Sequence, residues 1–173
     1  MKKIYILQMQ SYTGVSRMIS YLNRYPYSHV AISLQKDCQL LYSFGRLNPK
    51  WVFPGGLSIE RRNGAFYNRF SRTICRIYEL AVNDRQYENL KRYLEKMTEN
   101  REALSYDYCG IVLRFFHIPV SFKNRYVCTQ FCTEALDASG IWDPGKSHKW
   151  VRPQDFENIE GASQIYEGIY RQY

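Results

Sequence analysis

The chain has 173 residues, of which 45% are hydrophobic and 23% charged, and its formal net charge is +8. These values are typical of one soluble globular domain, residues 1–173, that is long enough to bury a core. The charge permits an anionic partner, but the basic residues are scattered and form no basic arm or RNA-binding signature. We therefore do not expect a nucleic-acid partner.

The cysteines form an odd set without a C-x-x-C pair: Cys38, Cys75, Cys109, Cys128 and Cys132. In a chain of this size the pattern predicts reduced thiols in a cytoplasmic protein. Gln8 and Gln10 interrupt the first apolar run, which argues against a signal peptide. The most apolar later stretch, 109–120, is too short to span a membrane and carries Arg114.

The N-terminal part predicts a strand, a helix and two further strands. Residues 3–10 alternate as a strand, and Thr13 can cap a helix that ends near residue 25. The β-rich runs at 29–34 and 40–44, joined by a polar turn, predict an antiparallel pair. The apolar stripe of the helix consists of Val15, Met18, Ile19 and Leu22.

The middle of the chain begins with a loop-rich segment at 45–56, which contains the apolar Trp51 and Phe53. We expect this segment to form a flap or a cleft wall. Strands are predicted at 57–61 and 73–82. Asn83 or Asp84 is expected to cap a helix that runs to about residue 97, with an apolar face of Tyr87, Leu90, Tyr93, Leu94 and Met97.

The C-terminal part predicts two helices, a short turn and a last strand. A helix is expected from about residue 105 through 116, ended by the residues before Pro119. A second helix follows residue 127 and stops near Gly140, and 153–156 is predicted as a short helical turn. A strand at 164–170 closes the chain. This mixture predicts an α+β fold, with a mostly antiparallel sheet packed against helices.

Cys128 falls in the first turn of the second of these helices, just after a short β-like run. Backbone N–H groups there lack intrahelical partners and the helix dipole is positive, so a thiolate is stabilised. A cysteine nucleophile also needs a base, and His29 on the predicted strand at 29–34 is the best candidate. His117 abuts a turn and His148 lies in a predicted surface loop.

Some of these residues also fit purely structural roles. Cys132 lies one turn further inside the helix on its apolar face, as a buried structural thiol does. Taken alone, His29 fits a strand histidine hydrogen-bonded in the core. Paired ligands at metal-binding spacing are missing, and Gly55-Gly56 lacks the Lys-Ser/Thr of a phosphate-binding loop. We therefore expect neither a metal nor a cofactor.

Three short motifs, SHVAI at 28–32, LYSFG at 41–45 and VCTQF at 127–131, carry a resemblance to a known family. Together they resemble the circularly permuted branch of the NlpC superfamily of papain-like cysteine hydrolases, which includes YiiX-type and lecithin–retinol acyltransferase-like enzymes. In that branch the histidine precedes the cysteine, as His29 precedes Cys128. The resemblance spans about residues 3–170 and implies a papain-like fold.

The resemblance implies that Cys128 is the nucleophile and His29 the general base. The third family position is usually Glu, Gln or His and here falls at Ser43, which cannot stabilise an imidazolium as a carboxylate does. Glu60 or Asp107 could supply the missing polar group. The Cys128 N–H would serve an oxyanion hole, and the remaining cleft candidates are Tyr12, Thr13, Trp51, Tyr106 and Asp107.

The expected function is a cysteine-dependent hydrolase or acyltransferase that forms a thioester from an amide or ester. The resemblance leaves the substrate open between a peptide, a cell-wall peptide and an acyl lipid; an apolar wall around Trp51 would favour the lipid. The alternative is a binding module on the same fold, with chemistry weakened at Ser43, for an anionic or polymeric ligand. Binding of nucleic acid through stacked tyrosines is a third, weaker hypothesis.

Overall fold

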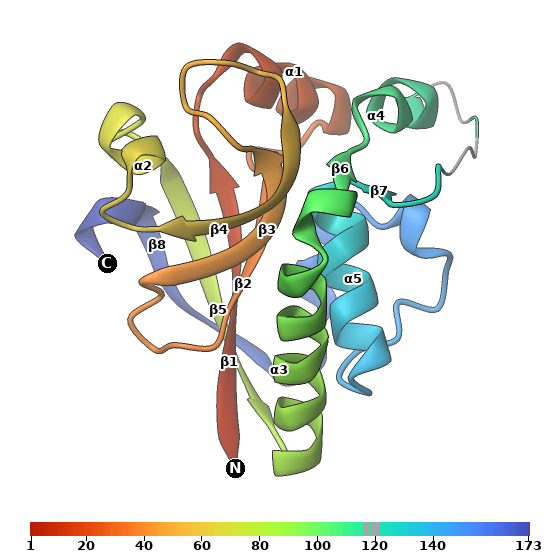
Figure 1. Ribbon diagram of the computed structural model, residues 1–173. Coiled ribbons are helices and arrows are strands. Elements are labelled where there is room, and N and C mark those ends of the chain that lie inside the picture. Colours follow the sequence, from red (N-terminus) through yellow and green to blue (C-terminus); the bar gives the residue numbers. More distant parts are fainter. Residues whose placement is uncertain (116–117, 119–121) are drawn as a thin grey trace.

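The computed structural model describes residues 1–115, 118 and 122–173. Its centre is a six-stranded antiparallel sheet in the order β4-β3-β2-β1-β5-β8 (Figure 1). The long strand β1 pairs with β2 on one side and with β5 on the other. The strands are β1 (Lys2–Gln10), β2 (His29–Ser33), β3 (Leu40–Arg46), β4 (Gly55–Arg61), β5 (Ile74–Val82) and β8 (Ala162–Ile169).

Five helices accompany the sheet within the described residues: α1 (Gly14–Asn23), α2 (Ala65–Arg69), α3 (Asp84–Glu99), α4 (Tyr108–Phe115) and α5 (Cys128–Ala138). A small parallel pair, β6 (Ser105–Tyr106) and β7 (Arg125–Tyr126), leads into α4 and α5. Short 3-10 turns lie at Arg101–Ala103, His148–Trp150, Pro153–Asn158 and Tyr170–Gln172.

The alternation of β1 divides the interior into two cores. Ile4 and Ile6 point to the face that α3 and α5 cover, where Phe131 and Leu136 of α5 are fully buried (Figure 1). Leu7 and other odd-numbered residues of β1 point to the opposite face, which α2 and the C-terminal turn cover. Successive side chains of a strand face opposite sides, so one apolar strand serves both cores.

The sequence predicted most of these elements. The strands near residues 3–10, 29–34, 40–44, 57–61, 73–82 and 164–170 are confirmed. Thr13 caps α1 by accepting from the Ser16 N–H, and Asn83 caps α3 in a reciprocal capping box with Gln86. Such caps each contribute about 1 kcal/mol.

Two predictions need correction. Residues 105 and 106 form β6 and not the start of a helix, because they pair with β7, and α4 begins only at Tyr108. The predicted end of that helix at residue 116, and His117, lie outside the described residues. The short helix α2 was missed, since five residues are too few to show a periodic pattern.

The segment expected to form a flap is shorter than predicted. β3 continues to Arg46 and β4 begins at Gly55, so residues 47–54 form the loop of a β-hairpin. Gly55 permits a close approach, because a β-carbon there would lie 2.4 Å from the Tyr108 hydroxyl and 2.7 Å from Cβ of Tyr106. None of the helices in the described part of the chain is long and apolar enough to cross a membrane.

Candidate active site

Cys128 is the first residue of α5, and its side chain is buried next to β2. Val127 precedes the helix as its N-cap, and its apolar side chain offers no acceptor to the first-turn N–H groups. The N–H groups of Thr129 and of Val30 on β2 instead donate to the Cys128 sulfur. The structure thus places Cys128 where the sequence predicted, at the positive end of a helix.

His29 is the first residue of β2, opposite Met9 of β1, and it forms a side-chain hydrogen bond with Cys128. The two residues are about a hundred positions apart in the sequence. They meet because α5 packs beside β2 and begins near the end of the sheet at which β2 begins (Figure 1). The predicted pair of nucleophile and base is therefore within bonding reach.

The electrostatics of the two groups reinforce each other. Burial alone would raise the pKa of the Cys128 thiol, but the charge and hydrogen bond of His29, with the two backbone N–H groups, lower this pKa below its usual value. Burial would lower the pKa of His29, but the charge and hydrogen bond of Cys128, and then the charge of Glu60, raise it. These opposite shifts favour a thiolate–imidazolium pair at neutral pH.

The carboxylate of Glu60 on β4 raises the pKa of the His29 imidazole by its charge. A β-carbon built on Gly45 would lie 3.6 Å from Cε1 of His29 and 3.8 Å from Oε1 of Glu60, so both groups flank the same glycine. The carboxylate is held by two donors: the Ser58 hydroxyl at 3.0 Å and the Tyr67 hydroxyl. Glu60 therefore acts on His29 by its charge, from a fixed position.

Ser43 takes a different place from the one that the resemblance implied. Its hydroxyl is fully buried and donates to the Val30 carbonyl oxygen at 2.6 Å. The same oxygen accepts from the Cys132 thiol at 3.5 Å. Ser43 thus fastens β3 to β2, and we correct its assignment from orienting His29 to a structural role.

Asp107 also has a structural position. Its carboxylate is buried and accepts from the Gly110 N–H at 2.8 Å, which caps the first turn of α4. A β-carbon on Gly110 would lie only 1.9 Å from Oδ2 of Asp107, so this cap requires glycine at position 110. Of the two alternatives to Ser43, Glu60 is the one whose charge reaches His29.

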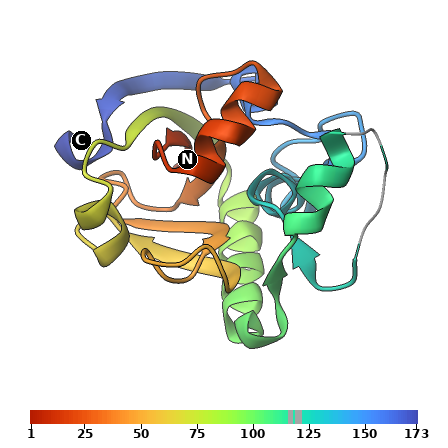
Figure 2. The same ribbon diagram turned by 90° about the horizontal axis from the view of Figure 1, so that it is seen from above.

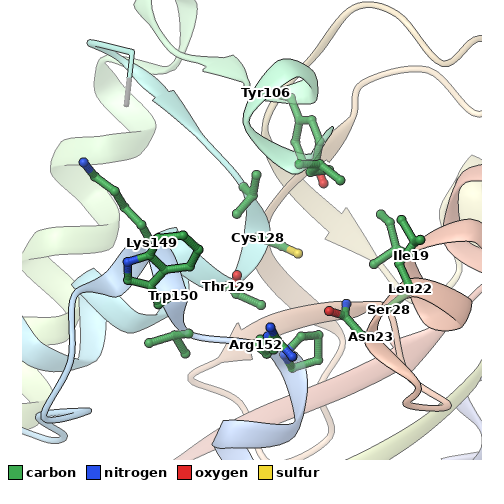
Figure 3. Close-up of a pocket in the computed structure, with 14 residues that line it drawn as sticks. Ile19, Leu22, Asn23, Ser28, Tyr106, Cys128, Thr129, Lys149, Trp150 and Arg152 are labelled. Carbon is green, nitrogen blue, oxygen red and sulfur yellow. The ribbon is translucent and has the colours of Figure 1, made fainter. Parts of the chain in front are cut away.

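Two adjoining pockets open on the two sides of the pair. The first, of about 200 Å³, contains Cys128, whose sulfur points toward α1 in Figure 3. Half of its fourteen lining residues are apolar: Ile19, Leu22, Ile111, Val127, Trp150, Val151 and Pro153. Arg152 and Lys149 supply positive charge at its edge.

The second pocket contains His29, and its lining is about as apolar as that of the first. Charged and hydroxyl groups of Arg46, Glu60, Tyr67 and Tyr108 line it together with the imidazole. Ser28, Ile19 and Tyr106 line both pockets and separate them. The arrangement resembles a cleft with the nucleophile exposed to one half and the base to the other.

The other predicted cleft residues divide into two groups. Thr13 lines the His29 pocket and accepts from the Arg46 guanidinium at 3.1 Å, and Tyr106 lines both pockets. Tyr12 and Trp51 line neither pocket, and both side chains are exposed. The loop reaches the site through Val52, whose carbonyl oxygen accepts from the Tyr108 hydroxyl.

Sequence reasoning missed three residues of the His29 pocket. Tyr67 lies on the missed helix α2, and no local pattern connects it to Glu60. Arg46 directly follows the LYSFG motif, and its charge lowers the pKa of His29, against the effect of Glu60. Tyr108 follows Asp107 and could have been found from the cluster of aromatic residues around position 106.

Among residues 1–115, 118 and 122–173, the structure places no group of three or more His, Cys, Asp or Glu side chains that could hold a metal ion. The free thiols other than Cys128 stand apart from the pair: Cys38, Cys75 and Cys132 are buried and Cys109 is exposed. Comparison of the sequence with models of known protein families gave no match, and comparison with curated proteins gave none either.

Proposed function

We propose that the protein is a cysteine-dependent hydrolase or acyltransferase of the permuted, papain-like NlpC type, acting on an amide or an ester. One observation carries the proposal: a buried thiol at a helix N-terminus is hydrogen-bonded to an imidazole, and their pKa values are shifted in opposite directions. A structural cysteine has no need of this environment, since burial alone raises the pKa of its thiol.

In the first step the Cys128 thiolate attacks the substrate carbonyl carbon, and the carbonyl oxygen becomes an oxyanion. We assign the Cys128 N–H, at the first position of α5, as a donor to that oxyanion. When the tetrahedral intermediate collapses, the bond to the leaving amine or alcohol breaks and the His29 imidazolium gives it a proton. The product that remains on the enzyme is a thioester.

In the second step neutral His29 accepts a proton from water or from an acceptor alcohol or amine, which attacks the thioester carbonyl. The carbon–sulfur bond breaks, the acyl product leaves and the thiolate–imidazolium pair is restored. Water as acceptor gives hydrolysis and an organic acceptor gives acyl transfer. The charge of Glu60 stabilises the imidazolium in the resting pair.

The two pockets support a division of the substrate. The acyl group bonds to sulfur and lies in the Cys128 pocket, whereas the leaving group takes its proton from His29 and lies in the His29 pocket. Because apolar side chains contribute the larger part of the Cys128 pocket, we favour an apolar acyl group, from a lipid or from a peptide residue with an apolar side chain.

The test begins with thiol reactivity. In a Cys109→Ser background, which removes the exposed thiol, alkylation by iodoacetamide is followed at each remaining cysteine by mass spectrometry from pH 5 to 9. We expect Cys128 alone to react quickly near neutral pH, and to lose this advantage in His29→Ala. An inert Cys128, or one no faster than Cys132, would overturn the proposal and favour the binding module.

Turnover is then tested with matched substrates. A series of nitrophenyl esters and anilides with acyl groups of increasing apolar length is compared in wild type and Cys128→Ala. We expect a burst of nitrophenol as the thioester forms, and a rise in kcat/KM with apolar length. A flat dependence on acyl length would contradict the division of the substrate and leave the thiol chemistry standing.

A further inference from the structure

The excess of positive over negative charge is concentrated in three segments, 11–27, 46–55 and 108–127. Together they contain seven Lys and Arg residues and no Asp or Glu, so they account for nearly all of the formal net charge of +8. The basic residues that looked scattered along the sequence therefore stand out because acidic residues are missing beside them. The rest of the chain, with the other 17 basic residues and all 16 acidic ones, is close to neutral.

The same three segments carry most of the large apolar side chains that the structure leaves in solvent. Tyr21 on α1 is 83% exposed, and Trp51 and Phe53 on the β3–β4 loop are 67% and 65% exposed. Leu47 on that loop and Phe122 before β7 are exposed as well. Exposed side chains of this size that gather together mark an interaction surface.

The described parts of these segments lie at one end of the molecule. In Figure 1, α1, the β3–β4 loop and α4 all stand at the end of the sheet opposite the N-terminus, and Figure 2 looks onto that end. Contacts join them: the Phe53 and Tyr108 rings are 4.3 Å apart, and residues of α1, the loop and α4 line the His29 pocket together. Residues of α1 and α4 also line the Cys128 pocket.

We propose that this end of the molecule docks onto a membrane surface that contains anionic lipids. Trp51 and Phe53 are suited to the headgroup region, because aromatic side chains concentrate at membrane interfaces. The exposed cations of the three segments, Arg17, Arg24, Lys50, Lys123 and Arg125, are complementary to a negative lipid surface. Because the three segments contain no Asp or Glu, they present no carboxylate that anionic headgroups would repel.

The combination favours a lipid surface over a nucleic acid. A nucleic acid would pair with the cations but leave aliphatic side chains such as Leu47 exposed to water. An anionic bilayer interface would pair with the cations and also remove the apolar side chains from water. Nearly all the apolar side chains on this end lie on loops and on a single helix turn, as expected for shallow contact with an interface. The proposal does not depend on the chemistry of Cys128.

The first experiment is co-sedimentation of the full chain with vesicles of phosphatidylcholine alone and with vesicles of equal parts phosphatidylcholine and phosphatidylglycerol. We expect binding only to the second kind, weakened by salt. Lys50→Glu/Lys123→Glu should lower the partition coefficient by at least about tenfold. The matched control, Arg85→Glu/Lys91→Glu, reverses two exposed charges on α3, near the other end, and should leave it unchanged.

The second experiment separates a membrane from an anionic polymer. Trp51→Ser/Phe53→Ser should abolish vesicle binding, and bromine-labelled lipids should quench the fluorescence of the wild type but much less that of Trp51→Phe. No binding to phosphatidylglycerol vesicles would overturn the proposal, as would equal effects of the test and control charge reversals. Tight binding to heparin that is unaffected by Trp51→Ser/Phe53→Ser, without vesicle binding, would also overturn it and indicate a polymeric ligand.

Discussion

The first and second turns of α5 place two cysteines in opposite chemical situations. Cys128 and Cys132 are four residues apart, both are buried, and both lie against Val30 of β2. Burial raises the pKa of the Cys132 thiol well above its usual value, whereas the charge and hydrogen bond of His29 reverse this effect at Cys128. A thiol one turn inside a helix meets a backbone carbonyl oxygen; a thiol at its start meets N–H groups.

The comparison shows that burial and reactivity are separate properties of a thiol. The deciding difference is which backbone groups and which charge face the sulfur. Cys38 and Cys75 extend the rule, because burial raises the pKa of each to about 12. Both should resist alkylation near neutral pH.

The largest difference is expected when each of the two cysteines is replaced by alanine in turn. Cys128→Ala should lower turnover of an activated ester by about four orders of magnitude or more, because no other group can form the thioester. Cys132→Ala removes only a packed thiol and should leave kcat/KM within a few-fold, while the free energy of unfolding falls by about 1 to 2 kcal/mol. Steady-state kinetics and urea unfolding of both variants provide the measurements. Equal losses of turnover would show that the two turns do not differ in function.

Removing the His29 imidazolium should raise the pKa of the Cys128 thiol, so that this thiol becomes as unreactive as that of Cys132. In His29→Gln, burial again dominates and the pKa of the Cys128 thiol rises. The thiolate fraction, and with it the alkylation rate at pH 6, should fall by about a hundredfold, since each pKa unit is a factor of ten. The rate difference from wild type should narrow toward pH 9. A pH–rate profile that keeps its wild-type shape in the variant would show that His29 does not control the thiol.

A smaller effect is expected from the carboxylate that supports the pair. Glu60→Gln keeps the shape and the acceptor oxygen but removes the charge that raises the pKa of His29. We expect kcat/KM to fall by about tenfold, equivalent to about 1.4 kcal/mol, and the alkaline limb of the pH–rate profile to move to lower pH. Glu157→Gln, which removes a carboxylate on the far side of the sheet, is the control. An unchanged alkaline limb would remove Glu60 from the mechanism.

The smallest effect should come from Ser43. Ser43→Ala deletes its bond to the Val30 carbonyl oxygen, which should cost about 1 kcal/mol of unfolding free energy. The alkylation rate of Cys128 should stay within about twofold, since Ser43 bonds to the carbonyl oxygen of Val30 and Cys128 to its N–H. A large loss of Cys128 reactivity would return Ser43 to the catalytic group that the resemblance implied.

The sequence predicted the features that depend on local pattern. Alternation and caps located the main strands and helices, and the β-like run before residue 128 placed Cys128 in the first turn of α5. The order of the motifs then paired that cysteine with His29. Each of these inferences rests on residues that are neighbours in sequence or on a motif.

The parts that the sequence could not predict depend on register and packing. Whether Glu60 can serve His29 is decided by how β3 and β4 pair, because a register shift of one residue would turn Glu60 to the other face of the sheet. Tyr67 reaches Glu60 from a helix too short to predict. Trp51 was expected to line the cleft, but the loop turns it to solvent and presents the backbone of Val52 instead.

The contact between the first residues of β2 and α5 also makes the reactivity of Cys128 a measure of whether the chain is folded. In an unfolded chain Cys128 has no imidazole beside it and no helix beneath it, so its pKa returns toward the ordinary value. Cys132 changes in the opposite direction, because unfolding exposes it to solvent. As the urea concentration is raised at mildly acidic pH, alkylation should therefore become slower at Cys128 and faster at Cys132. A nascent chain would likewise hold an ordinary thiol until α5 reaches the sheet.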